Sequence, residues 1–417
     1  MARPAKTQIA GAIAAIPLLA ALCAAATSHA QTPPSEVINN QIQLGDVFST
    51  QTLNVVEVEE GVSAGTSATG NALVGSVEAA DLAITSNQTM AASAIASTTV
   101  NVDTGMGAVS QINTTAIGNA VEAGATQGTM TGVYTQIATF SPEVTATGML
   151  EADTATAGDI GLATTAASNS VSLGLTNGSA GVLVNQTSAA SVLADGGAVV
   201  QYVSGAADVS GMASGNTMSL VGTDTSAARA EVYQSNTGAF TQASQFTAYG
   251  NAQTATTSTT ASGNVAAAVN EGPLLDLTTT QYNESYIRSQ AEGSSYQFGE
   301  GWATAFGVGN SVLAGNSGEA VVLENVQLNT GGGIEAIASF SGTDGYDGYA
   351  RATAVGNDVS GFSCAACTGT MTIGSRQTNE ADVGASATTN VGTGRVVNST
   401  STAVGNNASF YVTRPGS

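Results

Sequence analysis

The sequence is almost empty of histidine and lysine, two residues that many enzymes use for chemistry. Its single histidine, His29, and its single lysine, Lys6, both lie within the first 30 residues. Without an imidazole, the rest of the chain cannot build a Ser-His-Asp triad or a histidine-ligated metal site. Without a lysine, it cannot form a Schiff base or a Walker-type phosphate loop. The chemistry that stays open is that of paired carboxylates, as in glycosidases.

Positive charge and proline are also scarce. After residue 30 the chain has six arginines against 30 acidic residues, a formal charge of −24. Such a surface repels nucleic acid and favours cations or basic partners, so we expect no nucleic-acid partner. Only Pro142 and Pro273 interrupt the long span between Pro34 and Pro415. A chain poor in proline and lysine but rich in Val, Thr and small residues favours extended strands over a disordered stalk.

The N-terminus has the pattern of a secretory signal. Arg3 and Lys6 precede an apolar run over 9–26, and small residues at 28–30 allow cleavage after Ala30. The run is short and alanine-rich, which disfavours an uncleaved membrane anchor. We therefore predict a signal peptide at 1–30, a flexible polar leader at 31–46, a repeat domain at 47–410 and a C-terminal tail at 411–417.

What fills the remainder is an internal repeat. A Gly-Asn pair, replaced once by Ser-Asn, recurs at intervals of 46 to 50 residues, and a glutamine follows 17, 18 or 20 residues after each of the first seven asparagines. Stacked amide side chains can hydrogen-bond along a stacking axis, so this spacing predicts an amide ladder. Ordinary turn asparagines and surface glutamines are the alternative. The predicted ladder consists of Asn71, Gln88, Asn119, Gln136, Asn169, Gln186, Asn216, Gln234, Asn264, Gln281, Asn310, Gln327, Asn357, Gln377 and Asn406.

The segments between these amides alternate with period two, as in Ala350-x-Ala352-x-Ala354-x-Gly356. We predict an all-β fold, a β-solenoid or β-helix-like rod with a period of about 48 residues and about seven repeats. Two coils per repeat is an alternative, which the spacing of Gln88, Gln111 and Gln136 favours. We expect each Gly-Asn pair to turn the chain at a corner, because both residues tolerate positive φ. The open sheet edges of a solenoid also lead us to expect self-association.

Other candidate sites are weaker. The acids of 57–60, 344–347 and 380–382 could supply a carboxylate pair, but none stands out from the scattered acidic residues. Cys364 and Cys367 are the only cysteines after residue 30, and an exported chain allows them to form a disulfide clip or an intermolecular link. We expect no cofactor and at most weak surface Ca²⁺. Aromatic residues that could contact a glycan or a protein partner, or could cover a loop, are Tyr286, Tyr296, Trp302, Tyr346 and Tyr349.

Recurrent Gln-x-Asn marks, such as Gln234-x-Asn236 and Gln377-x-Asn379, are similar to those of curlin-type fibre subunits, although the period is about twice as long. With its export signal and its acidic body rich in small residues, the chain more closely resembles the HfaD-type holdfast attachment proteins of stalked alphaproteobacteria, over most of 50–410.

That resemblance implies a non-enzymatic cell-surface protein that anchors an adhesive polysaccharide, the holdfast, to the cell envelope. It also implies export through a curli-like outer-membrane pore and companion holdfast anchor proteins, and it brings no catalytic residues. The alternatives are a secreted β-helical enzyme that degrades polysaccharide with a carboxylate pair, and an amyloid-like fibre subunit.

Overall fold

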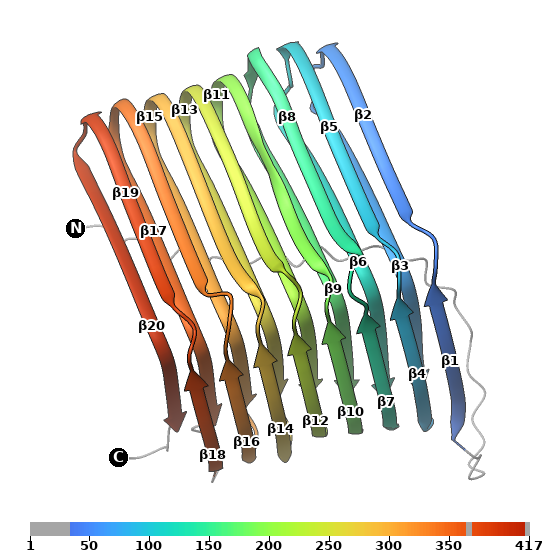
Figure 1. Ribbon diagram of the computed structural model, residues 1–417. Coiled ribbons are helices and arrows are strands. Elements are labelled where there is room, and N and C mark those ends of the chain that lie inside the picture. Colours follow the sequence, from blue (N-terminus) through green and yellow to red (C-terminus); the bar gives the residue numbers. More distant parts are fainter. Residues whose placement is uncertain (1–33, 364–368, 413–417) are drawn as a thin grey trace. The chain divides into compact units, whose positions relative to one another are not determined.

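A computed structural model describes residues 34–363 and 369–412. The chain divides into residues 1–33 and a second compact unit that begins at Pro34. The described part of this second unit consists of β-strands without a helix, and all of its strand pairs are parallel. The predicted all-β solenoid is therefore confirmed, and Figure 1 shows its strands lying side by side, coil after coil.

Each coil has a short strand followed by two long arms. The short strands are β1 (Ser35–Gln43), β4 (Leu82–Met90), β7 (Thr129–Ala138), β10 (Ser179–Ser188), β12 (Ala227–Asn236), β14 (Leu274–Asn283), β16 (Ala320–Asn329) and β18 (Thr370–Asn379). In the outer coils the arms are separate strands, namely β2 (Val47–Glu57), β3 (Ser63–Glu78), β5 (Ala94–Gly105), β6 (Val109–Thr126), β8 (Glu143–Ala157), β9 (Asp159–Thr176), β19 (Val383–Thr393) and β20 (Val396–Val412). In the other coils both arms belong to one bent strand, namely β11 (Ser191–Thr223), β13 (Phe240–Asn270), β15 (Tyr286–Asn316) and β17 (Ile334–Ser363).

The strand register shows that one repeat makes one coil. The short strands form an eight-stranded sheet, and the long arms form the second sheet. Within the first sheet Gln186 pairs with Gln136 on one side and Gln234 on the other, a full repeat away in each direction. The alternative of two coils per repeat is therefore wrong, and the described chain makes eight coils. At about 4.8 Å per coil, the first and last coils lie roughly 34 Å apart.

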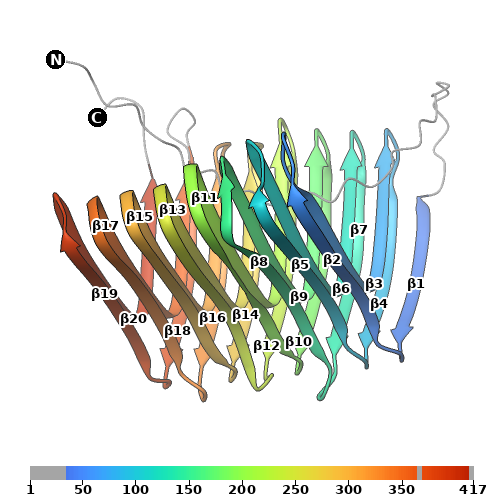
Figure 2. The same ribbon diagram turned by 90° about the horizontal axis from the view of Figure 1, so that it is seen from above.

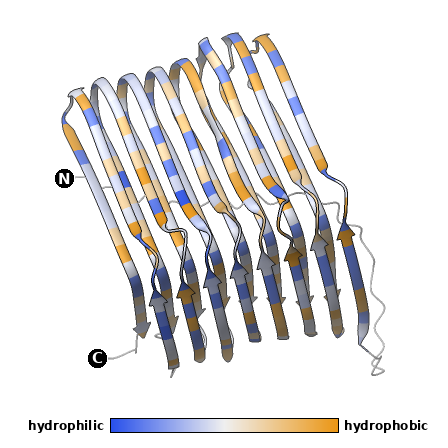
Figure 3. Ribbon diagram, in the orientation of Figure 1, coloured by the Kyte–Doolittle hydropathy of each residue, from blue (hydrophilic) through white to orange (hydrophobic). Residues whose placement is uncertain are grey.

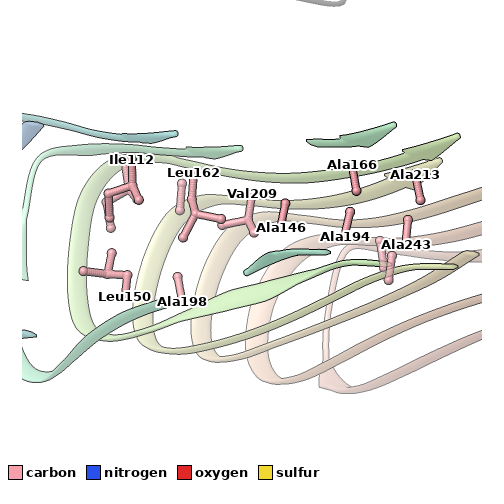
Figure 4. Packing of buried hydrophobic residues seen from close by; sticks show 14 of the residues in the cluster. Ile112, Ala146, Leu150, Leu162, Ala166, Ala194, Ala198, Val209, Ala213 and Ala243 are labelled. Carbon is pink, nitrogen blue, oxygen red and sulfur yellow. The ribbon is translucent and has the colours of Figure 1, made fainter. Parts of the chain in front are cut away.

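Two apolar cores run along the stacking axis. The larger core lies between the two long arms and includes Leu150 of β8 and Leu162 of β9. Figure 4 shows Ile112 and Leu162 pointing from one layer toward Leu150 and Ala198 of the other. The smaller core lies between the end of the second arm and the short strands, and includes Leu173. Alanine is frequent in both cores because small side chains let the layers approach closely.

Buried and exposed residues alternate along the long arms because one face of each arm packs on a core. Inward residues of β5 are buried and their neighbours are partly exposed, which is the period-two pattern expected for a strand with one packed face. Figure 3 shows the corresponding change between hydrophobic and hydrophilic residues along the ribbons. Viewed from above, the long arms and the short strands form successive parallel rows (Figure 2).

The predicted boundaries of the repeat domain need one correction. The predicted flexible leader contains β1, which pairs along its whole length with β4. The polar composition of this segment concealed the strand, because as the first strand of its sheet it buries little surface beyond Gln43. At the other end β20 continues to Val412, and the rest of the predicted tail lies outside the described residues.

Candidate functional site

The asparagines of the repeated Gly-Asn pairs stand in one file along the solenoid. Each Nδ2 donates to the Oδ1 of the asparagine in the next coil, from Asn71 to Asn406, with N···O distances of 2.7 to 2.8 Å. The same Nδ2 also donates to a backbone carbonyl of the following short strand, such as that of Thr187 for Asn169. Except for Asn406 at the end of the file, these amides are buried but hydrogen-bonded, so burial leaves no donor unpaired in the middle of the file.

The glutamines form a second file that runs in the opposite direction. Each Nε2 donates to the Oε1 of the glutamine in the preceding coil, from Gln377 back to Gln41, at 2.7 to 2.9 Å. A second bond reaches the backbone of the long arm, as from Gln186 to the carbonyl of Thr217. The two files thus connect each short strand to the long arms beside it. Gln41, the first member of the file, was missed because it lies in the segment assigned to the leader.

A third, shorter file occupies the position two residues after the glutamine in the last four coils. Asn236, Asn283, Asn329 and Asn379 are joined by N···O contacts of 2.6 to 3.2 Å. In the second to fourth coils the same register position holds Met90, Ala138 and Ser188. The recurrent Gln-x-Asn spacing was the signal in the sequence for this file.

The glycine of each Gly-Asn pair has a different role from the predicted one. The pairs lie inside long strands, and none of these glycines has a positive φ. A Cβ on Gly215 would lie only 2.6 Å from the carbonyl oxygen of Gly263 and 2.6 Å from Cγ of Asn236. Glycine is therefore needed at position 215 because neighbouring coils approach closely there, whereas a Cβ on Gly405 of the last coil would meet nothing closer than 3.7 Å. Ser168 replaces glycine once, and its Oγ lies 2.9 Å from Oγ of Ser188.

Four of the five predicted aromatic contacts gather where the long arms bend. Trp302 and Tyr349 are register partners in β15 and β17, and their rings stack with centroids 3.9 Å apart. Tyr296 and Tyr346 fall at positions that the β15–β17 register skips, and they are 62% and 65% exposed. Irregular positions of this kind re-aim side chains, here toward solvent. Tyr286 lies apart from them at the start of β15 and is half-buried, with its hydroxyl 2.5 Å from Glu335.

Two open hollows lie on this bend. One, of about 620 Å³, is lined by Tyr249, Tyr296, serines and the 390–392 segment. The other, of about 600 Å³, is lined by Tyr202, Tyr346, Asp344 and neighbouring amide side chains. We call this surface, together with the stacked Trp302–Tyr349 pair a few residues farther along β15 and β17, the bend surface. It combines flat aromatic faces with hydroxyl, amide and carboxylate groups, which are the groups that bind sugar rings and their substituents.

Two acids near the bend surface, Asp344 and Asp347, are engaged in structural contacts. Arg395 donates through Nε to Asp347 at 3.0 Å and through a second guanidinium nitrogen, and it lies 6.0 Å from the centre of the Tyr346 ring. The guanidinium holds the pKa of the Asp347 carboxyl below its usual value. Asp344 accepts a hydrogen bond from Thr393. The Asp347 carboxylate, which Arg395 holds ionised, is a poor general acid.

The described residues offer neither a metal cluster nor a membrane-spanning helix. Among residues 34–363 and 369–412, no three Asp, Glu, His or Cys side chains gather as a metal site would require. The same residues contain no helix of the length and hydropathy that a bilayer crossing demands. Cys364 and Cys367 lie outside the described residues, as does the predicted signal peptide.

These features define a class of protein: a parallel β-solenoid held by internal amide files, with an aromatic surface at one bend. The family model for holdfast attachment protein D (HfaD) matches residues 56–333 and 344–415. The chain therefore belongs to the holdfast attachment protein D family. Comparison with curated proteins and with solved structures gave no significant match.

Proposed function

We propose that this protein is a non-enzymatic anchor at the cell surface that holds an adhesive polysaccharide to the envelope through its bend surface. Family membership supports a role in holdfast attachment. The proposal that the bend surface binds this polymer rests on two hollows that each span four coils and include the exposed Tyr296 or Tyr346. The stacked Trp302–Tyr349 pair follows a few residues farther along β15 and β17. A polymer that lies along the stacking axis can contact several coils at once, and several weak contacts add up to a retained chain.

The charge of the molecule favours a cationic glycan. The chain after residue 30 carries 30 acidic residues and six arginines. A polysaccharide with free amino groups would be attracted to this surface, and its cations can also lie over exposed tyrosine rings. Neutral or acidic glycans would gain no such attraction.

Binding to a defined polymer tests the glycan contact. We expect the exported chain to bind partly deacetylated poly-N-acetylglucosamine more tightly than the fully acetylated polymer, with the difference shrinking at high salt. Tyr296→Ser together with Tyr346→Ser should weaken binding about tenfold or more. Tyr233→Ser is the matched control, because Tyr233 is an exposed tyrosine on short strand β12. Equal binding by all three proteins would contradict the proposal.

A deletion strain tests the anchoring role. We expect cells without the protein to make adhesive polysaccharide and shed it into the medium. The chain should fractionate with the outer membrane, and its surface exposure should require the signal at 1–30, a curli-like pore and companion anchor proteins. A strain that keeps its polysaccharide but loses an activity releasing reducing ends would instead favour the β-helical hydrolase.

A further inference from the structure

Among residues 34–363 and 369–412, nothing covers the two apolar cores at the first and last coils. Val37, Leu53 and Val55 of the first coil and Ile373 and Val383 of the last are only partly buried against their cores. The outer edges of these coils also have no strand beside them among the described residues, because β1, β2, β18 and β19 terminate their sheets, β3 pairs only with β6, and β20 pairs only with β17. An uncovered core beside an unpaired parallel strand edge is a surface that another solenoid coil can continue.

The amide files end with complementary groups. Among the described residues, Asn406 accepts from Asn357 but donates no side-chain hydrogen bond, whereas Asn71 donates but its Oδ1 accepts none. The glutamine file is reversed: Gln377 donates to Gln327 and its Oε1 accepts none. Gln41 donates to one backbone carbonyl, and the second N–H of its amide is left over. The last coil therefore offers an asparagine donor and a glutamine acceptor, and the first coil offers their counterparts.

Register extends the match to the backbone. Inside the molecule, each asparagine amide donates a second bond to a short-strand carbonyl, as Asn71 does to Thr89. Ile42 holds the register position of Thr89 in the first coil. If the last coil of one copy lay on the first coil of another, Asn406 would face Oδ1 of Asn71 and the carbonyl of Ile42. The same register would place Ile373 over Val37, which continues the smaller core.

We propose that copies of this chain stack head to tail, with the coil of β18, β19 and β20 of one copy on the coil of β1, β2 and β3 of the next. The opposite polarity of the two amide files makes this orientation specific. A stack of two first coils would run their strands antiparallel and would offer only donors from the two Gln41 residues and only acceptors from the two Asn71 residues, so neither file would continue. The occupant of each end is thus a second copy in the same direction.

Charge sets the conditions for stacking. Asp46 and Asp382 each precede the first residue of a long arm and occupy the same register position, so stacking brings these two acids together. Repulsion between acidic copies is screened when the Debye length falls from about 30 Å at 0.01 M salt to about 8 Å at 0.15 M. Association should therefore strengthen with salt, opposite to the salt dependence proposed for glycan binding.

Sedimentation velocity of the full exported chain tests the stack. We expect integer multiples of the monomer mass that grow with protein concentration and with salt. Asn406→Asp keeps the oxygen that accepts from Asn357 but removes the donors aimed outward, so the concentration at half-association should rise at least about tenfold. Ser409→Asp adds the same charge three residues away in β20 and should change it less than about twofold. A single monomeric species at all concentrations, or equal association of all three proteins, would overturn the proposal.

Cysteine cross-linking tests the direction. Asn54 and Asn390 are exposed and hold the same register position at opposite ends of the solenoid. The background for this experiment carries Cys364→Ser and Cys367→Ser, which remove the native thiols of the exported chain. In that background, the double variant Asn54→Cys and Asn390→Cys should give disulfide-linked multimers. Thr50→Cys with Asn390→Cys, four residues out of register, should give at most about a tenth as much. Equal yields from both pairs, or dimers from Asn54→Cys alone, would overturn the head-to-tail arrangement.

Discussion

Asparagine suits the centre of this coil because its amide has two donors and one acceptor on a short side chain. One N–H donates to the asparagine of the next coil, and the other donates to the adjacent short strand. The oxygen accepts from the asparagine of the preceding coil. A buried polar group stabilises a fold only when its hydrogen bonds are completed, and a repeat spaced by one strand separation completes them in each interior coil. The same residue on a surface would gain little from this geometry.

Replacing one interior amide tests this account of the asparagine file. Asn216→Ala would leave the Asn169 donor and the carbonyl of Ser235 without their partner. We expect it to lower the free energy of unfolding by about 2 kcal/mol or more in denaturant titration. The control is Asn54→Ala, which removes an exposed Asn–Asn hydrogen bond from the outer face of the first coil and should cost no more than about 0.5 kcal/mol. Equal losses would contradict the account.

Glycine substitutions separate close packing from backbone freedom. Gly215→Ala would place a methyl group 2.6 Å from a carbonyl oxygen of the next coil, whereas a Cβ at Gly181 meets nothing within 4 Å. Gly215→Ala should therefore destabilise by about 1–3 kcal/mol, as overpacking does. Gly181→Ala should be neutral or stabilise by up to about 1 kcal/mol. Thermal unfolding of both variants measures the difference. A Gly215→Ala variant that melts like the wild type would contradict the requirement for close packing at Gly215.

The ion pair at the bend predicts a pH dependence. Arg395 lowers the pKa of Asp347, so the folded state favours the ionised carboxylate more than the unfolded state does. The resulting stability is present above the unfolded pKa and is lost as pH falls through the lower folded pKa. Arg395→Gln should raise the NMR-detected pKa of Asp347, and it should lower the melting temperature at pH 7 more than at pH 2–3. A difference in melting temperature that stays constant with pH would contradict the role of the pair.

At the scale of the element, the repeat is one closed coil of three segments. Because β12 pairs with β14 from Ala227↔Leu274 onward, removal of residues 227–273 deletes one coil and keeps the register of the neighbours. We expect this variant to fold with the same strand content in circular dichroism and a cooperative melt. Removal of 227–249, about half a coil, should abolish the cooperative melt, because it misaligns the amide files and both cores. Comparable folding of the two variants would contradict the single-coil repeat.

The sequence predicted the length of the repeat and the amide positions but not the number of coils that each repeat forms. The same regular spacing of Asn and Gln would occur in the sequence whether each repeat formed one coil or two. The half-period suggested by Gln111 was misleading because that side chain is exposed on β6, outside the glutamine file. Nor did the sequence show that Gly215 is required by a carbonyl of the next coil rather than by a turn, since that contact joins residues 48 apart. The bend surface was only partly predicted, because register decides that Trp302 meets Tyr349.

For the molecule as a whole, the parallel solenoid has the properties that a role in attachment requires. A surface attachment protein must hold its shape when it is pulled. A parallel stack resists deformation because each coil is hydrogen-bonded to its neighbours along its whole length. High negative charge keeps single copies soluble and leaves attraction for cationic partners. The absence of histidine and lysine after residue 30 costs such a scaffold nothing.

The distance between equivalent positions in two coils tests the central claim of one coil per repeat. Thr85 of β4 and Glu324 of β16 are exposed, hold the same register position and lie five coils apart. Nitroxide labels at these positions, in chains diluted with unlabelled protein, can be measured by double electron–electron resonance. One coil per repeat predicts a separation of about 24 Å, from five steps of about 4.8 Å. A separation near 48 Å, as two coils per repeat would give, or a broad distribution without a maximum, would contradict the account.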